Sequence, residues 1–120
     1  MKQESKSSIL FRHWLRANPQ YTSSFEMKDT RGKDTFRIAE VKQAQIDYAL
    51  AIKSDKGVLI RTEGVTGLPD YIYLRNEPAY FVIKYPKHIY IIDVDDFLTI
   101  KTKSMTEEQA IKIATKKIPL

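Results

Sequence analysis

The chain has 120 residues, of which 42% are hydrophobic and 11% aromatic, and it carries 20 lysines and arginines against 15 aspartates and glutamates. This composition suits one globular domain over residues 1–120 and excludes an intrinsically disordered chain. Because there is no cysteine, a disulfide framework and a thiolate metal site are both excluded. No apolar run is long enough for a signal peptide or a membrane span, so we expect a cytoplasmic protein with no membrane partner.

The net charge of +5 and the isoelectric point near 9.4 favour a polyanionic partner, nucleic acid first. The basic residues are spread along the chain and form no block typical of a disordered basic arm. Charge alone fits a merely basic protein equally well.

The N-terminal half predicts a helix, a strand and a second helix. Apolar residues at three- and four-residue spacing predict a helix over residues 3–17, which Asn18-Pro19 ends. Residues 24–30 alternate as a strand, and residues 31–34 follow as a polar turn. The second helix is predicted to begin between residues 36 and 40 and to end near Lys53, with Gly57 as a left-handed exit.

The C-terminal half predicts four strands, at residues 58–62, 71–75, 80–85 and 89–94. Turn residues at 76–78 and 86–88 predict hairpins between neighbouring strands. A closing helix is predicted over 106–117, with Thr106 as N-cap and Gln109 as its capping-box partner. The order α-β-α-β-β-β-β-α predicts a mixed central sheet flanked by helices, in the α/β or α+β class.

The first predicted strand carries a carboxylate and an ammonium on one face. Glu26 and Lys28 would lie about 7 Å apart along the strand, opposite the face of Phe25 and Met27. Such a carboxylate can hold Mg²⁺, and such a lysine can position a water or steady the charge of a phosphate. A solvated ion pair is the plain alternative.

The second helix predicts a polar group above that strand. Gln45 shares a face with apolar residues, so its amide must find partners beneath the helix. Those partners are either the Glu26 strand or the backbone. The apolar residues of this face are Val41, Tyr48, Ala49 and Ile52.

Other acids are candidates for a second metal ligand. Glu4 lies in line with the buried stripe of the first helix, and Asp70 follows Pro69 at the mouth of a strand. A first-turn glutamate that favours the helix dipole and a turn aspartate are the alternatives. For Asp93, Asp95 and Asp96 we expect a turn or helix N-cap rather than catalysis.

Several chemistries find no support in the sequence. His13 and His88 lack metal-ligand spacing, and we expect neither to be catalytic. There is no glycine-rich phosphate loop, nucleophile elbow or Cys/His arrangement, which excludes P-loop hydrolysis and acyl-enzyme chemistry.

Residues 25–30 (FEMKDT), a basic turn and residues 36–45 (FRIAEVKQAQ) together resemble Holliday-junction resolvase-like proteins of Gram-positive bacteria and their phages. Residues 69–74 (PDYIYL), 78–83 (PAYFVI) and 90–97 (YIIDVDDF) resemble the phage branch of that group. The similarity covers roughly residues 4–98.

The resemblance implies a restriction-endonuclease-like PD-(D/E)xK nuclease fold that acts on branched DNA with Mg²⁺ or Mn²⁺, usually as a homodimer. By that analogy Glu26 is a metal ligand, Lys28 the catalytic lysine and Gln45 a supporting polar residue. Glu4 and Asp70 would complete the metal site. The residues expected to contact DNA are Arg31, Lys33, Arg37 and Lys42.

The chain departs from the family pattern in two places. The family places a metal-binding aspartate before the E-x-K strand, whereas the segment from Arg16 to Ser24 has no acid. Asp70 is then the candidate to fill that place from later in the chain. Ala44 stands where relatives often carry histidine.

Two other functions are compatible with the sequence. One is a DNA-binding module that keeps the nuclease fold without chemistry. The other is an interaction protein that pairs a partner along an exposed β edge.

Overall fold

The computed structural model describes the backbone of residues 6–18, 24–63 and 69–120, with side chains over 9–18, 25–61 and 71–120. Its helices are α1 (Lys6–Ala17), α2 (Gln43–Lys53), α3 (Val94–Phe97) and α4 (Glu107–Ile113), with a 3-10 helix η1 (Ile38–Glu40). Its strands are β1 (Ser24–Asp29), β2 (Thr35–Arg37), β3 (Val58–Glu63), β4 (Pro69–Leu74), β5 (Ala79–Lys84), β6 (His88–Asp93), β7 (Ser104–Thr106) and β8 (Lys116–Pro119). No helix among the described residues is long and apolar enough to cross a membrane.

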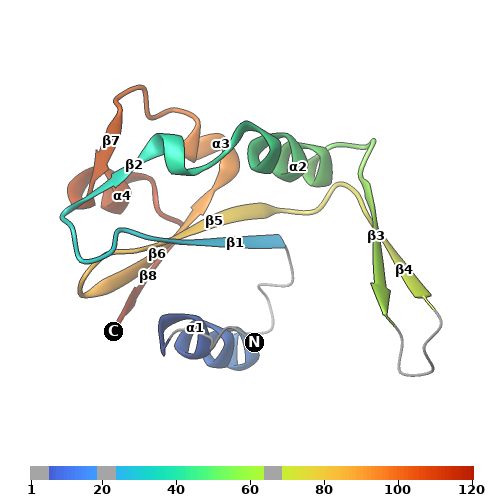
Figure 1. Cartoon of the computed structure of the whole chain (residues 1–120), viewed down its shortest axis with the longest axis horizontal. Coiled ribbons are helices and arrows are strands. Elements are labelled where there is room, and N and C mark those ends of the chain that lie inside the picture. The colour runs from blue at the N-terminus through green and yellow to red at the C-terminus, as the bar shows by residue number, and fades with distance from the viewer. Residues whose placement is uncertain (1–5, 19–23, 64–68) are drawn as a thin grey trace.

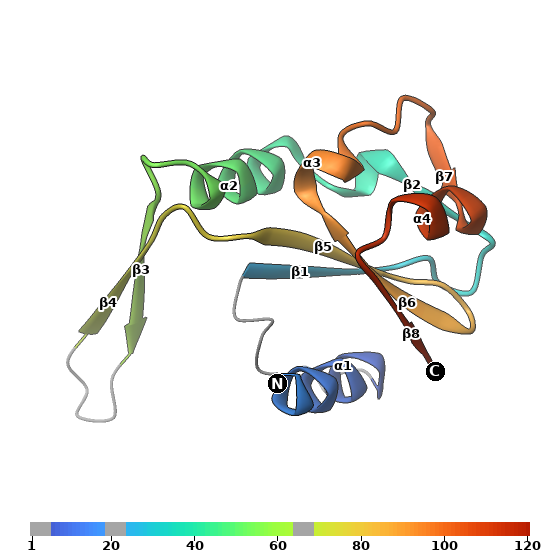
Figure 2. The same ribbon diagram turned by 180° about the vertical axis from the view of Figure 1, so that it is seen from behind.

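The central sheet has four strands in the order β1-β5-β6-β8. β1 runs parallel to β5, while β5–β6 and β6–β8 are antiparallel. Figures 1 and 2 show α1 on one face of this sheet and α2 and α3 on the other. The prediction of a mixed central sheet flanked by helices is confirmed.

The middle strands β5 and β6 are buried on both faces, which explains their nearly continuous apolar sequences. Alternate side chains enter two cores. Phe81 joins the core under α2 and α3, where its ring meets Phe97 edge-on at 4.9 Å between centroids. Val82 joins the core under α1, together with Phe11.

β3 and β4 form a separate two-stranded sheet that projects from one end of the molecule (Figure 1). The radius of gyration, 15.1 Å, exceeds the roughly 13.6 Å expected for a compact chain of this length, as a projecting hairpin requires. The large exposed apolar side chains of the β3–β4 sheet are Leu59, Tyr71, Ile72 and Tyr73.

The prediction of a hairpin at residues 76–78 is wrong. β4 pairs with β3, and the next strand, β5, pairs with β1 and β6. The turn is held by the end of α2 instead, because Asn76 N–H donates to Ser54 O at 3.0 Å and Glu77 N–H to Ile52 O at 3.1 Å. The hairpin predicted at 86–88 is confirmed: β5 and β6 are antiparallel, and Tyr85 N–H donates to His88 O.

The second and the closing predicted helix are longer than the observed ones, because part of each predicted helix pairs as a strand with a distant segment instead. Residues 35–40 form β2 and η1 rather than the start of α2, because Phe36 pairs with Met105 of β7. The closing helix ends at Ile113, and the chain then joins β6 as β8. Its Thr106–Gln109 capping box is confirmed, as is the left-handed Gly57, at φ +67°. Residues 3–5 of the first predicted helix lie outside the described residues.

Candidate functional site

β1 presents Glu26 and Lys28 on the face that α2 covers. Phe25 and Met27 point the other way and pack against the core under α1. Lys28 Nζ lies 3.7 Å from Glu26 Oε1, with the lysine side chain 20% exposed and the glutamate 47% exposed. The predicted strand alternation therefore places a carboxylate beside an ammonium in a half-buried position.

Gln45, in the first turn of α2, uses both ends of its amide. Its Oε1 accepts from the backbone N–H of Lys42 at 3.0 Å, which caps the helix start. Its Nε2 donates to Glu26 Oε1 at 2.8 Å. The prediction that Gln45 faces the Glu26 strand is confirmed, and both of its predicted partners, backbone and strand, are present.

The face of α2 is less buried than its apolar pattern predicts. Val41, Ala49 and Ile52 are buried, but Tyr48 is 44% exposed. Tyr48 lines a cavity of about 240 Å³ together with Glu26, and Tyr80 of β5 also lines it. The sequence pattern did not assign either tyrosine to the site, although Tyr80 lies in β5, the strand next to β1.

Glu26, Lys28 and Gln45 form what we call the acid–lysine–amide cluster. The amide restrains one carboxylate oxygen, and the second oxygen of Glu26 makes no hydrogen bond or ion pair among the described residues. An ammonium and a carboxylate so arranged can engage a phosphate and a water respectively.

Neither of the two other predicted metal ligands, Glu4 and Asp70, has its side chain among the described residues. Glu4 lies outside the described residues. The backbone of Asp70 pairs with Thr62 in the β3–β4 sheet, and its side chain lies outside the described residues. The strand that contains Asp70, β4, therefore bonds to β3 in a separate sheet and not to the strands of the sheet that holds Glu26.

The described residues do not by themselves supply a complete set of metal ligands. Within the described residues, no group of three or more acids and histidines could hold a metal ion. Glu26 supplies the cluster with one carboxylate, and Mg²⁺ commonly takes one or two together with phosphate oxygens and waters. The donor set described here is therefore incomplete without a further acid or a bound phosphate.

A basic face runs from the cluster past the turn that follows β1. Three neighbouring hollows lie along it and share lining residues. The first hollow is lined by Lys28 and Lys42, and the second is lined by Lys33. Arg31 lines both of these hollows. Arg37 links the second hollow to a third, with Lys101 and Lys103. All four predicted DNA contacts, Arg31, Lys33, Arg37 and Lys42, are exposed on this face. The sequence pattern did not reveal Lys101 and Lys103, because β2–β7 pairing brings them alongside Arg37.

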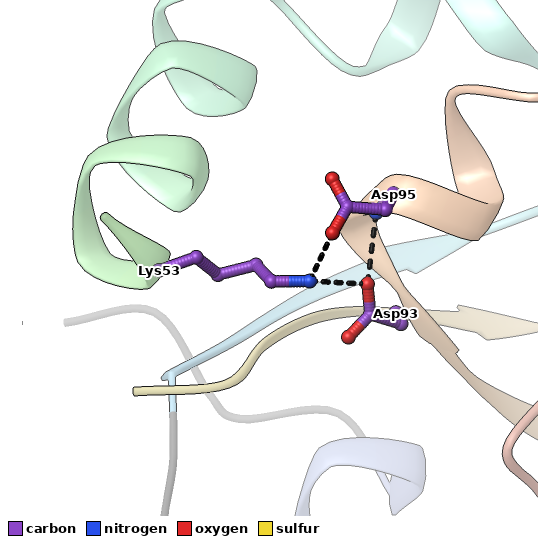
Figure 3. A network of polar contacts seen from close by, with 3 residues as sticks. All are labelled: Lys53, Asp93 and Asp95. Carbon is purple, nitrogen blue, oxygen red and sulfur yellow. Dashed lines mark hydrogen bonds and ion pairs between the residues drawn. The ribbon is translucent and has the colours of Figure 1, made fainter. Parts of the chain in front are cut away.

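Asp93, the last residue of β6, and Asp95 of α3 have a structural role. Asp93 accepts from the backbone N–H of Asp95 and caps α3, as predicted. Figure 3 shows Lys53 of α2 reaching both carboxylates, with 2.7 Å to Asp93 Oδ1. Burial acts to lower the pKa of Lys53, but its bonds to Asp93 and Asp95 outweigh burial and raise that pKa. This network ties α2 to α3.

A second polar network, partly buried, joins β6 to α4. Tyr90 Oη donates to Glu107, and His88 Nδ1 lies 3.3 Å from the same carboxylate. Burial raises the pKa of Tyr85 and, together with Glu107, that of Tyr90 well above the ordinary value. The phenols therefore stay protonated and serve as hydrogen-bond donors.

Comparison of the chain with protein-family models, curated proteins and solved structures gives no match.

Proposed function

We propose that this chain is a metal-dependent endonuclease of the PD-(D/E)xK type, with a restriction-endonuclease-like fold, that hydrolyses phosphodiester bonds in branched DNA. The observation that carries the proposal is the 2.8 Å hydrogen bond from Gln45 to Glu26, with Lys28 Nζ 3.7 Å from the same oxygen. These three side chains come from positions 26, 28 and 45 of two different elements.

Each side chain of the cluster has a part in the proposed reaction. Gln45 fixes the orientation of the Glu26 carboxylate, because its own amide is held by the start of α2. Lys28 offers its ammonium to the phosphate whose charge grows during attack by water. Mg²⁺ or Mn²⁺ bound at Glu26 would supply further charge neutralisation and a more acidic water.

The basic face supports DNA as the substrate. Its lysines and arginines adjoin the cluster, so a strand with a phosphate at Glu26 can continue along them. We place the reaction in the cytoplasm of a bacterial cell or phage-infected host, in recombination or phage DNA processing.

We also propose a homodimer, because symmetric cutting of two strands needs a two-fold arrangement. The exposed Leu59, Tyr71 and Tyr73 of the β3–β4 hairpin favour an intermolecular contact there.

A second candidate function is a DNA-binding module that keeps the fold without chemistry. It is favoured by one observation: within the described residues, Glu26 is the one carboxylate of the cluster. Binding along the basic face would need neither a metal nor the cluster.

The deciding experiment is a cleavage assay on a four-way junction and on linear duplex, with Mg²⁺, Mn²⁺ or EDTA. We expect junction cleavage with either metal and none in EDTA. Glu26→Gln and Lys28→Met should each lower the rate about 10²–10³-fold, the usual loss when one group that stabilises developing charge is removed.

Two variants on exposed positions of α4, Glu108→Gln and Lys112→Met, remove the same charges away from the cluster and should cleave normally. Tight junction binding without cleavage under any metal would favour the binding module. Cleavage that survives Glu26→Gln would refute the assigned site.

A further inference from the structure

Thr30, at the end of β1, has a buried hydroxyl group without a partner in the described part of the chain. The residue is 5% exposed, and its Oγ1 makes no hydrogen bond. Its backbone is satisfied: Thr30 N–H donates to Lys84 O at 3.0 Å, and Thr30 O accepts from Lys33 N–H at 3.3 Å. A buried hydroxyl left unpaired is costly, so this hydroxyl requires a partner from outside the described protein atoms, either a water or a ligand.

Thr30 lines a cavity of about 150 Å³ that also contains Arg31, Lys33 and Arg37. Asp29 and Glu40 are the acids of its wall. Asp29 is already engaged, since its Oδ1 accepts from Arg31 N–H at 2.7 Å and its Oδ2 lies 3.8 Å from Lys84 Nζ. Positive side chains therefore predominate around the unpaired hydroxyl.

The turn that shapes this cavity holds a non-glycine residue in the left-handed region. Arg31 has φ +58° and Gly32 has φ +81°. An arginine adopts this conformation only when the surroundings impose it, and such residues concentrate at binding sites. The conformation keeps Arg31 at the boundary of the cavity and the adjoining hollow that holds Lys28.

We propose that this cavity is a phosphate-binding site, in which Thr30 Oγ1 donates to one phosphate oxygen and Arg31, Lys33 and Arg37 contact the others. A phosphate ester has the acceptor oxygens that the hydroxyl lacks and the charge that guanidinium groups match. Resting on the proposed nuclease function, we assign the bound group as a phosphodiester of the DNA backbone.

The position of Thr30 gives that phosphate a separate role from the one that is cut. Thr30 follows Glu26 by four positions, about 13 Å at the usual rise of a strand. The phosphate bound there is therefore a different one from the phosphate at the cluster, and its contact sets the register of the DNA over the cluster.

The test compares the wild-type chain with Thr30→Val and Thr30→Ser. Valine keeps the shape and removes the hydroxyl, while serine keeps the hydroxyl. Without phosphate, Thr30→Val should melt at or above the wild-type temperature, because the lost hydroxyl has no protein partner. That result separates loss of a ligand from loss of the fold.

Inorganic phosphate, titrated at constant ionic strength against chloride, should raise the melting temperature of the wild type and of Thr30→Ser. In Thr30→Val we expect the phosphate affinity to fall at least about tenfold, the loss of one charge-assisted hydrogen bond. Equal phosphate responses in wild type and Thr30→Val would overturn the site, leaving a water as the hydroxyl's partner.

Junction binding in EDTA separates the two sources of phosphate. If the group is a DNA phosphodiester, Thr30→Val weakens binding and Thr30→Ser does not. If phosphate binding depends on Thr30 but junction affinity does not, the site takes free phosphate and the DNA assignment is overturned. Failure of the nuclease proposal appears elsewhere, as absent wild-type cleavage, and leaves the phosphate titration unaffected.

Discussion

Gln45 combines a structural bond and a functional one in a single amide. Its oxygen closes the first turn of α2, and its nitrogen reaches Glu26. Because the backbone N–H of Lys42 requires an acceptor, the nitrogen end must face β1. Helix capping thereby fixes which group Glu26 meets.

Two substitutions at Gln45 separate these bonds. Gln45→Ala removes both hydrogen bonds and should lower the free energy of unfolding by about 1–3 kcal/mol. Gln45→Glu keeps an acceptor for the backbone N–H of Lys42, so we expect this variant to be more stable than Gln45→Ala. Neither variant can donate a hydrogen bond to Glu26, and Gln45→Glu sets a second carboxylate against it, so we expect both to cleave poorly. Urea denaturation and the junction assay measure the two effects. A stability of Gln45→Ala equal to that of the wild-type chain would contradict the capping role.

Much of the cluster could be predicted from sequence because it depends on local periodicity. A period of two puts Glu26 and Lys28 on one strand face, and a period of 3.6 turns Gln45 toward the sheet. The burial of Thr30 could not be predicted this way. It arises where Phe36, Arg37 and Glu40 come to share a cavity with the end of β1.

At the scale of elements, the turn residues marked changes of direction correctly but not the pairing that follows them. Asn76 has φ +55°, in keeping with a tight turn. Yet the strands on either side of it belong to different sheets. Pairing depends on contacts between distant segments, and β2, β7 and β8 were missed for the same reason.

Gly57 connects α2 to β3 at a point of close approach, and this supplies a matched pair of glycine substitutions. A Cβ at Gly57 would lie 2.5 Å from Leu74 O, whereas one at Gly32 would meet nothing within 4 Å. Both residues have positive φ, at +67° and +81°. Gly32→Ala should therefore cost only the backbone strain, about 1 kcal/mol, and Gly57→Ala clearly more.

Chemical denaturation midpoints of the two alanine variants test this difference. If Gly57→Ala is no less stable than Gly32→Ala, β4 does not approach Gly57 as closely as the 2.5 Å distance to Leu74 O requires.

At the scale of the whole molecule, the chain has a net charge of +5, and several of its lysines and arginines lie together on the basic face. If DNA contacts six to ten phosphates along it, affinity should fall about 10³–10⁵-fold between 50 and 200 mM salt. Fluorescence anisotropy with a labelled junction in EDTA measures this slope. A response that stays flat over this range would argue against a nucleic-acid partner.

The position of β1 in the sheet also governs the order in which the chain can fold. β1 bonds only to β5 in the described sheet, and Ser24 finds its partner at Ala79, 55 positions later. By contrast, β5 and β6 are joined by a short turn, and we expect them to pair early because closing a short loop costs little entropy. Because β1 has no other strand partner in the described sheet, we expect Glu26 and Lys28 to be fixed in the sheet only when this long loop closes, after β5 and β6 have paired. A partly folded chain in which only β5 and β6 have paired would then lack the β1 side of the cluster.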